Sequence, residues 1–283
     1  MLPTSKHSTL LNRIPKDTKL IYHYTTKETA LEKILQSGKL RLCPLENTND
    51  PRENKYWLLN VTSSIETVFE KDFYKECMDE FNDRLKTHCR IAAFSTDDKR
   101  LKPDQNGRNG YAHSRMWAQY AANHTGVCLL FDSAKLLQTA KHELPASGTI
   151  WEGRVMYGVT HNVRDTKTPF KISYAGPDSV DRHIREHFSS LLFEKSKDWQ
   201  DESEYRIAFY SPENRGASLE IGIHDSLSGI IVGVDFPNIY NCSVRELSEK
   251  YRISADHMQW ERGEPLLSHP IYDYEYEHQK PIP

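Results

Sequence analysis

The stretch Ile21–Pro51 reads IYHYTTKETALEKILQSGKLRLCPLENTNDP and predicts a strand, a helix, a second strand and a polar loop. Residues 21–24 are apolar or aromatic, as in a short strand, and Thr25 with Glu28 three residues later makes a capping box that begins a helix. Apolar residues then recur at helical spacing, and Gly38 can end the helix as a left-handed cap. The second strand follows directly, and a polar loop closes the stretch.

His23 is the residue in this stretch that points to a site. It lies near the end of the first strand, between two tyrosines and just before the helix. An imidazole in this place can exchange a hydrogen bond with a ligand hydroxyl, and the free amides of a helix start suit an anion such as a phosphate. The alternative is that His23 only packs within an aromatic strand.

The composition is that of an ordinary soluble globular protein. Of 283 residues, 37% are hydrophobic and 27% are charged. We expect a single domain over residues 1–283, with a core at about residues 20–260 and an extended C-terminal tail at residues 265–283. The formal net charge of -3 excludes attraction of the whole chain to nucleic acid or to an anionic membrane, but it allows a local basic groove.

Cysteine usage and hydropathy bear on localisation. The five cysteines are scattered and form no CxxC pair, which is typical of reduced thiols. No window has the length and apolar character of a membrane-spanning helix, and the amino end lacks the apolar run of a signal peptide. The sequence therefore predicts a cytoplasmic protein without a membrane partner.

The middle of the chain predicts scaffold helices, a strand and an aromatic helix. Residues 53–88 place apolar residues among many charges, which is typical of one or two amphipathic scaffold helices. Residues 89–95 read as a strand that ends at Ser95, and a long polar loop follows. A helix that Ser114 can cap then presents one face made of Met116, Trp117, Tyr120 and Ala121. These aromatic side chains are either core residues or exposed platforms that stack on nicotinamide or a base.

The second half alternates helices and strands. We expect helices at residues 133–143 and 179–197, and another that begins at the capping box of Ser243 and Glu246. Strands are expected at residues 151–157, 204–210, 220–223 and 230–234. The predicted fold class is α+β, with mixed, mainly antiparallel sheets and inserted helices.

A histidine pair in the helix expected at residues 179–197 suggests a metal. His183 and His187 lie four residues apart within HIREH, which matches the HxxEH pattern of inverted zinc peptidases. A third ligand would have to be Glu261 or Glu264. The alternative is a solvated helix face rich in charge, and we favour a protein without a metal site.

The segment Lys197–Tyr210, KDWQDESEYRIAFY, carries the late acidic residues. An alternating strand there places Glu202, Glu204 and Arg206 on one face. These side chains form either a site or a structural salt bridge. A second Glu-x-Glu occurs at residues 275–277, so the spacing alone is not distinctive, and the neighbouring Trp and Arg favour the first copy.

The ordered motifs of the chain resemble those of a bacterial family of unknown function. The motifs are HYT (23–25), SGKLRL (37–42), NDP (49–51), AFS (93–95), MWAQYA (116–121), HTGV (124–127) and WQDESEYRI (199–207). The first segment also distantly resembles DarT-type and RNA 2'-phosphotransferase-type enzymes of the ADP-ribosyltransferase superfamily. That resemblance implies an ADP-ribosyltransferase-like fold, NAD as the substrate and a role as a toxin or anti-phage defence effector.

The resemblance also implies a division of labour among the residues. His23 would bind the ribose and Glu204, or alternatively Glu202, would be the catalytic carboxylate near the developing positive charge. Arg41 or Arg52 would supply an active-site arginine. The acceptor, nucleic acid or protein, stays open. The further cofactor-binding residues would be Tyr24, Thr25, Asn49, Asp50, Ser95, Trp117, Tyr120, Glu202 and Arg206.

Two other functions remain compatible with the sequence. One is a non-catalytic nucleotide-binding or protein-interaction module, in which Glu204 would only pair with Arg206. The other is a zinc-dependent hydrolase centred on His183 and His187.

Overall fold

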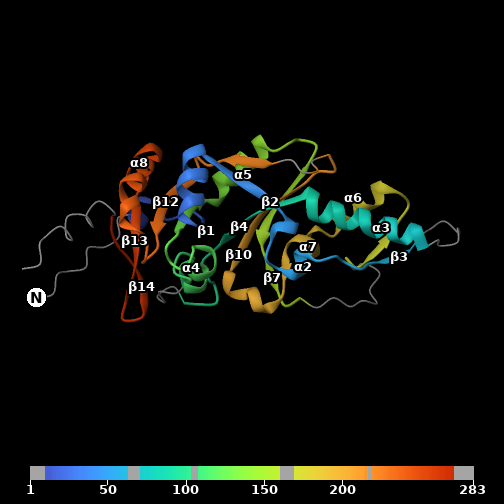
Figure 1. Cartoon of the computed structure of the whole chain (residues 1–283), viewed down its shortest axis with the longest axis horizontal. Coiled ribbons are helices and arrows are strands. Elements are labelled where there is room, and N and C mark those ends of the chain that lie inside the picture. Colours follow the sequence, from blue (N-terminus) through green and yellow to red (C-terminus); the bar gives the residue numbers. More distant parts are fainter. Residues whose placement is uncertain are drawn as a thin grey trace, which may run out of the picture.

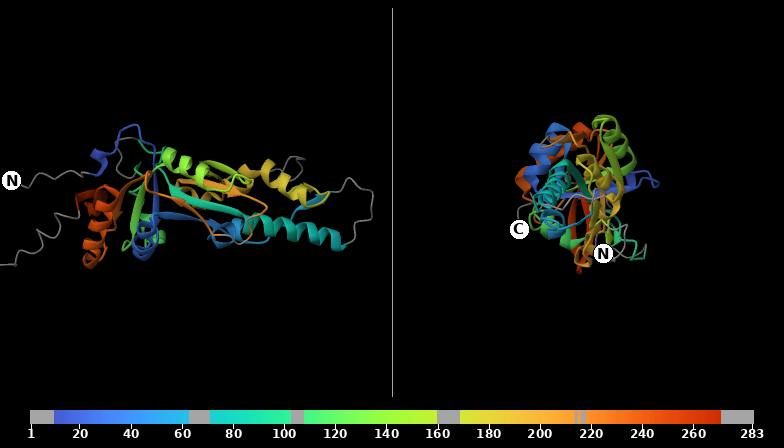
Figure 2. Two further views of the ribbon diagram at one scale, coloured as in Figure 1. Left: turned by 90° about the horizontal axis from the view of Figure 1, so that it is seen from above. Right: turned by 90° about the vertical axis from the view of Figure 1, so that its right-hand side faces the viewer.

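The computed structural model describes residues 10–62, 71–102, 108–159, 169–213, 215 and 218–270. The molecule is elongated, with α8 (Asn241–Tyr251) near one end and α3 (Lys71–Asp83) near the other (Figure 1, Figure 2). A branched β-sheet joins the two ends, and helices pack against it. None of the described helices is long and apolar enough to cross a membrane.

The sheet is mainly antiparallel. Its order is β11 (Leu219–Gly222), β2 (Lys39–Pro44), β4 (Cys89–Ser95), β1 (Leu20–Thr25), β5 (Val127–Asp132), β12 (Leu227–Val232), β13 (Ala255–Glu261) and β14 (Glu264–Pro270). Off this path, β10 (Glu204–Tyr210) pairs with β4 and with β6 (Thr149–Arg154). Among the described strands of this sheet, β12 and β13 are the one parallel pair. Two small parallel sheets join β3 (Asn60–Thr62) to β8 (Lys171–Ser173), and β7 (Met156–Tyr157) to β9 (Glu194–Lys195).

Helices connect these strands, and most are short. The α-helices not yet given are α1 (Leu10–Arg13), α2 (Pro51–Asn54), α4 (Ser114–Tyr120), α5 (Ser133–Glu143), α6 (Pro177–Glu186) and α7 (Phe188–Leu192). The part of the chain that the structure describes also has the π-helical segments η1 (Thr29–Leu35) and η3 (Arg84–His88). Its 3-10 turns are η2 (Leu45–Asn47), η5 (Lys197–Glu202) and η6 (Asn238–Tyr240). The predicted α+β class with a mixed, mainly antiparallel sheet is confirmed.

The sheet branches at β4, and the branch opens a gap. On one edge β4 pairs with β10 over its whole length, from Glu204 opposite Ser95 to Tyr210 opposite Cys89. On the other edge it pairs with β2 at its start and with β1 only at Ser95. Residues 92–94 of β4 therefore have no strand partner on that edge among the described strands, and β1 and β2 diverge around them.

Apolar side chains cover both faces of the sheet. One cluster lies under η1, α5 and α8, and a second lies on the opposite face with α4. A third packs β4 and β10 against α3, α6 and α7. Along β1, Ile21 belongs to the first cluster and Tyr22 and Tyr24 belong to the second. Because side chains alternate along a strand, His23 points to the side of Ile21.

The opening stretch follows the prediction except in its capping residues. Gly38 has a φ of +72° and ends the helix, as expected. Thr25, however, is the last residue of β1, and Thr26 begins the helix because its Oγ1 accepts a hydrogen bond from the Thr29 amide at 3.2 Å. The polar loop contains a second helix start, where Asp50 Oδ1 accepts a hydrogen bond from the amide of Arg52 at 2.9 Å.

Several predicted boundaries are wrong. The helix expected at residues 179–197 is two helices that end at Leu192, because residues 194–195 pair with β7 instead. Neither expected cap holds: Ser114 is the first residue of α4, and Ser243 lies inside α8. The first part of the extended tail expected at residues 265–283 belongs to strand β14, which ends at Pro270. Residues 271–283 lie outside the described residues.

Candidate functional site

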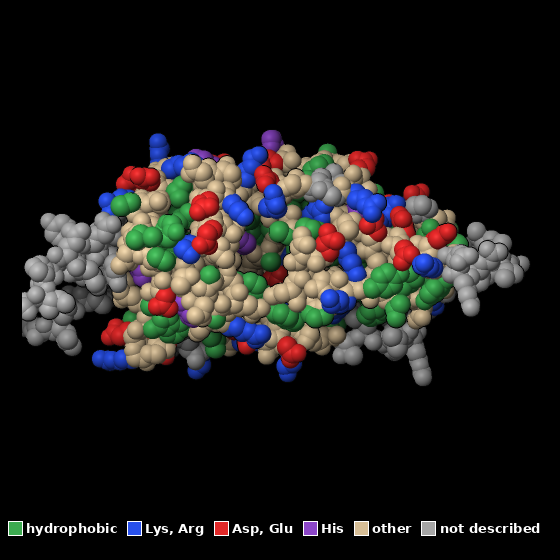
Figure 3. Space-filling view, viewed as in Figure 1, with side chains coloured by type: hydrophobic (Ala, Val, Ile, Leu, Met, Phe, Trp, Pro, Cys, Tyr) green, Lys and Arg blue, Asp and Glu red, His purple; other side chains and the backbone are tan. Residues whose placement is uncertain are grey.

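A cavity of about 340 Å³ fills the gap that opens beside β4. Its walls come from β1, β2 and β4, from the loop before α2, and from α2, α4, β9, η5 and β10. Figure 3 shows the hollow near the middle of one face, with acidic side-chain atoms at its base. The branch in the sheet therefore brings together side chains that are far apart in the sequence.

His23 forms part of the wall where β4 lacks a strand partner. Its Nδ1 lies 3.1 Å from the carbonyl oxygen of Ala93, and its ring lies against Phe94, with centroids 5.8 Å apart. A carbonyl oxygen can only accept, so Nδ1 carries the proton and Nε2 keeps an acceptor lone pair. Burial lowers the pKa of His23, and the hydrogen bond to Ala93 opposes part of that effect. The imidazole is therefore a neutral hydrogen-bond acceptor.

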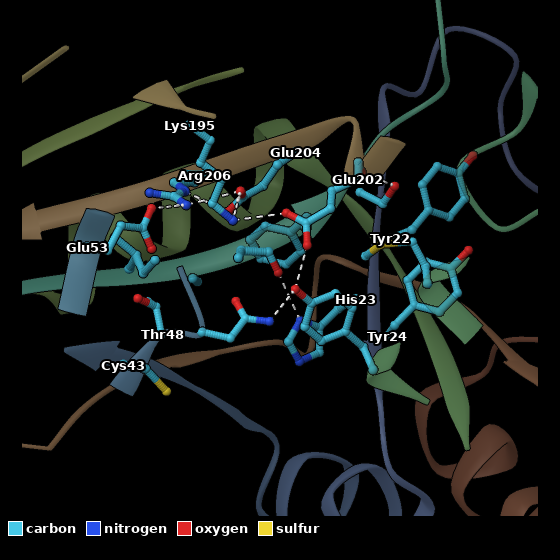
Figure 4. Close-up of a pocket in the computed structure, with 18 of the residues that line it drawn as sticks. Tyr22, His23, Tyr24, Cys43, Thr48, Glu53, Lys195, Glu202, Glu204 and Arg206 are labelled. Atoms are coloured by element: carbon cyan, nitrogen blue, oxygen red, sulfur yellow. Dashed lines mark hydrogen bonds and ion pairs between the residues drawn. The ribbon is translucent and has the colours of Figure 1, made fainter. Parts of the chain in front are cut away.

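A row of five charged side chains forms the base of the cavity (Figure 4). Lys195 Nζ lies 2.9 Å from Glu202 Oε2 and 2.8 Å from Glu204 Oε2. On the other side of Glu204, the Arg206 guanidinium lies 2.5 Å from Glu204 Oε1 and 2.5 Å from Glu53 Oε1. All five side chains are buried. We call these residues the ion row.

The ion row contains one more carboxylate than cations. Burial alone would raise the pKa of Glu204, but Arg206 and Lys195 outweigh burial and hold that pKa below its ordinary value. Burial acts against both cations, yet the adjacent carboxylates raise the pKa of Lys195 and of Arg206. Glu204, Lys195 and Arg206 therefore keep their charges at neutral pH. Carboxylates placed in this way can stabilise a positive charge in the cavity.

Hydrogen bonds connect the ion row to the rim. Tyr120 donates from its hydroxyl to Glu202 Oε1 at 2.5 Å and accepts from Asn49 Nδ2 at 2.9 Å. Ser95 Oγ donates to the backbone oxygen of Glu202 at 2.7 Å and lies 3.2 Å from His113 Nδ1. These contacts fix Glu202 from both its side chain and its backbone.

Most of the residues expected at the site from the sequence line this cavity. They are His23, Tyr24, Asn49, Ser95, Tyr120, Glu202, Glu204 and Arg206. Thr25 and Asp50 do not line it, because Thr25 pairs with Val127 in the sheet and Asp50 begins α2. Glu202 also differs from expectation, since it belongs to η5 and reaches the cavity from outside the strand.

Trp117 is a core residue and does not line the cavity. Its side chain is 0% exposed, its indole N–H donates to the carbonyl of Tyr111 at 2.7 Å, and its ring meets the edge of Tyr24. For Trp117 the packing interpretation therefore holds and the expected contact with nicotinamide is wrong, whereas Met116 and Tyr120 of the same stripe line the cavity.

Replacing Trp117 with phenylalanine is expected to lower the free energy of unfolding by about 1–3 kcal/mol, because the smaller ring leaves space and the Tyr111 carbonyl loses its donor. Urea denaturation measures this loss. Ligand affinity of the cavity should stay unchanged in the folded variant, and a weakened affinity would place Trp117 at the site after all.

The sequence did not indicate Glu53 and Lys195. Glu53 falls in the segment expected to be scaffold, and Lys195 falls in the segment expected to be helical. Nothing in their local pattern distinguishes them from surface charges. Of the two suggested arginines, Arg41 lines the cavity with a side chain 63% exposed, whereas Arg52 instead binds Glu194 at 2.9 Å.

The zinc hypothesis fails in its third ligand. Glu261 and Glu264 face each other in the β13–β14 hairpin, at the opposite end of the molecule from α6 (Figure 1). His183 is buried, with Nε2 3.0 Å from the Pro169 carbonyl and its ring 4.4 Å from that of His187. Among the described residues no group of three or more potential metal-binding side chains converges.

Burial lowers the pKa of His183 to about 4, which predicts an acid-sensitive step in stability. The unfolded chain binds the proton at about pH 6.5, so the free energy of unfolding should fall by up to about 1.4 kcal/mol per pH unit between about pH 6.5 and 4. Denaturant titrations across this range measure the slope. His183→Gln keeps a donor for the Pro169 carbonyl and should flatten the slope of stability against pH. His142→Gln, at an exposed position on α5, should leave that slope unchanged. Equal slopes in the two variants would contradict the assignment to His183.

Comparison with known proteins gives a family match over part of the chain. No curated protein and no solved structure matches the chain. The family match begins at the MWAQYA motif in α4 and ends within β10. It includes Tyr120, Lys195, Glu202, Glu204 and Arg206 but neither His23 nor Glu53. It confirms the resemblance to a family of unknown function over that part of the chain. Residues 116–207 match the family model described as a protein of unknown function (DUF2971).

Proposed function

We propose that the cavity binds NAD and that the protein is an ADP-ribosyltransferase-like enzyme that cleaves the bond between nicotinamide and ribose. One observation carries this proposal: His23 of β1 lines the same cavity as Glu202 and Glu204, which follow it by more than 175 residues. The reaction needs a group that holds ribose and a carboxylate that faces the developing positive charge.

The walls of the cavity support this assignment. Nε2 of His23 can accept a hydrogen bond from a ribose hydroxyl. The extra carboxylate of the buried ion row can stabilise an oxocarbenium-like centre. The aromatic and apolar surfaces of Tyr24, Tyr120 and Met116 offer a place for the nicotinamide ring, and Arg41 at the exposed end suits the phosphates.

A non-catalytic nucleotide-binding module is a second candidate. The observation that favours it is that both oxygens of Glu204 are already paired with Arg206 and Lys195. A carboxylate held in this way serves structure as well as chemistry. The cavity would then still bind a nucleotide, without releasing nicotinamide.

Incubation of the purified protein with NAD tests the proposal. Nicotinamide release and any adduct are measured by mass spectrometry, with DNA, RNA or cell lysate as acceptor. We expect release that His23→Ala abolishes and that His142→Ala, an exposed histidine on α5, leaves unchanged. The adduct would identify the acceptor as nucleic acid or protein, and transfer to either fits a toxin or defence effector. NAD binding without release would favour the module, and neither binding nor release would overturn both functions.

A further inference from the structure

We propose that Glu202, held in place by Tyr120, is the catalytic carboxylate, and that Glu204 is a fixed counter-ion. This inference rests on the proposed NAD cleavage and assigns separate tasks to the two neighbouring glutamates. It follows from the order of charges in the ion row and from the hydrogen bonds at its end.

The ion row alternates in sign along its whole length. It runs Glu53, Arg206, Glu204, Lys195, Glu202, and in Figure 4 it ends on the side of the β1 tyrosines. Glu204 lies in the middle and contacts a cation on each side. Within the ion row each terminal carboxylate contacts one cation, so the surplus negative charge belongs to the ends.

Both ends of the ion row are buried and line the cavity, and hydrogen bonds link Glu202 to the cavity rim. Glu53 lies at the other end, where Arg206 contacts its Oε1 at 2.5 Å. Glu202 Oε1 contacts the hydroxyl of Tyr120, which lines the cavity and also binds Asn49 at the rim. A ligand that enters from the rim therefore meets Tyr120 beside the carboxylate of Glu202.

The two glutamates also differ in what a ligand must displace. A ribose hydroxyl can donate to the second lone pair of Glu202 Oε1 while the Tyr120 hydroxyl, a neutral donor, stays bound to the first. Glu204 is enclosed by Lys195 and Arg206, and a ligand that displaces either cation leaves a buried charge without its partner. The first contact costs much less free energy than the second, so substrate contact falls to Glu202.

Tyr120 is a positioning residue in this arrangement. Its phenol fixes the carboxylate of Glu202 opposite Lys195, and Asn49 fixes the phenol. Tyr157 offers a matched control, because it is also a largely buried phenol but accepts a hydrogen bond only from the backbone amide of Glu204 at 2.8 Å and does not line the cavity.

Steady-state kinetics of nicotinamide release, together with urea denaturation of each full-length variant, test the assignment. Glu202→Gln should lose at least about 100-fold in kcat and keep an unfolding midpoint near that of the wild type. Tyr120→Phe should lose about 10-fold in kcat with KM for NAD nearly unchanged, whereas Tyr157→Phe should keep both within about 3-fold. Glu204→Gln should lower the unfolding midpoint more than Glu202→Gln does, because it removes the carboxylate between two buried cations.

The outcomes separate this inference from the proposed function. Wild-type kcat in Glu202→Gln would overturn the assignment alone, as would a folded, inactive Glu204→Gln beside an active Glu202→Gln. Glu202→Gln and Tyr120→Phe decide the question even if Glu204→Gln does not fold. If the wild-type protein itself releases no nicotinamide, the proposed function is wrong and the catalytic role of Glu202 with it.

Discussion

Replacing Arg206 with methionine is expected to lower the free energy of unfolding by about 3–5 kcal/mol. Arg206 is fully buried, its guanidinium lies 2.5 Å from both Glu204 and Glu53, and it donates to the carbonyl of Leu192 at 2.7 Å. Methionine keeps an apolar stem but no charge, so Glu53 loses its cation and Glu204 loses one of two. Equilibrium denaturation in urea, followed by circular dichroism, measures the loss.

A surface arginine and a second substitution control this experiment. Arg215 is 73% exposed and pairs with Asp83 at 3.2 Å, so Arg215→Met should change the free energy of unfolding by less than about 1 kcal/mol. Adding Glu53→Gln to Arg206→Met removes the carboxylate that was left without a cation and should restore part of the stability. A loss below about 1 kcal/mol in Arg206→Met, or no recovery in the double variant, would contradict the buried ion row.

Local sequence patterns predict the strands and helices that carry the cavity better than they predict the full set of charged residues at its base. The strand at residues 89–95 and the helix at 133–143 have the expected boundaries, and His23 was placed correctly near the end of its strand. These features depend on side-chain period and on nearby capping or turn residues, which the sequence displays directly. Alternation along a strand likewise put Glu204 and Arg206 on one face.

The branch at β4 was beyond such patterns, because it depends on which strands pair across long separations. Residues 92–94 look like any buried strand in the sequence, yet their open edge makes the cavity. The residues before Lys195 predict a helix through that position, and pairing with β7 overrides this local preference. Glu53 lies in the first turn of a helix, where acidic residues are common on the surface. Its burial is explained by the ion pair with Arg206, which lies over 150 residues later in the sequence.

Replacing His23 with phenylalanine is expected to lower the rate of nicotinamide release by at least about 100-fold. Phenylalanine can keep the ring contact with Phe94 but offers no acceptor to a ribose hydroxyl. The carbonyl of Ala93 loses its donor, but Ala93 is exposed and water can replace the bond, so the fold should persist. Nicotinamide release and circular dichroism of the same sample separate the two effects, and a folded variant with wild-type kcat would exclude His23 from the chemistry.

The pH dependence of nicotinamide release should report the protonation state of His23. Burial lowers the pKa of His23 below the ordinary value of about 6.5, so the neutral form with its Nε2 acceptor is complete at neutral pH. Protonation below that value converts Nε2 into a donor, which cannot accept the hydrogen bond from a ribose hydroxyl. The rate is therefore expected to stay level from about pH 8 to 6.5 and to decrease at lower pH. A rate that rises as the pH falls through this range would identify the charged imidazolium as the active form and contradict the role assigned to Nε2.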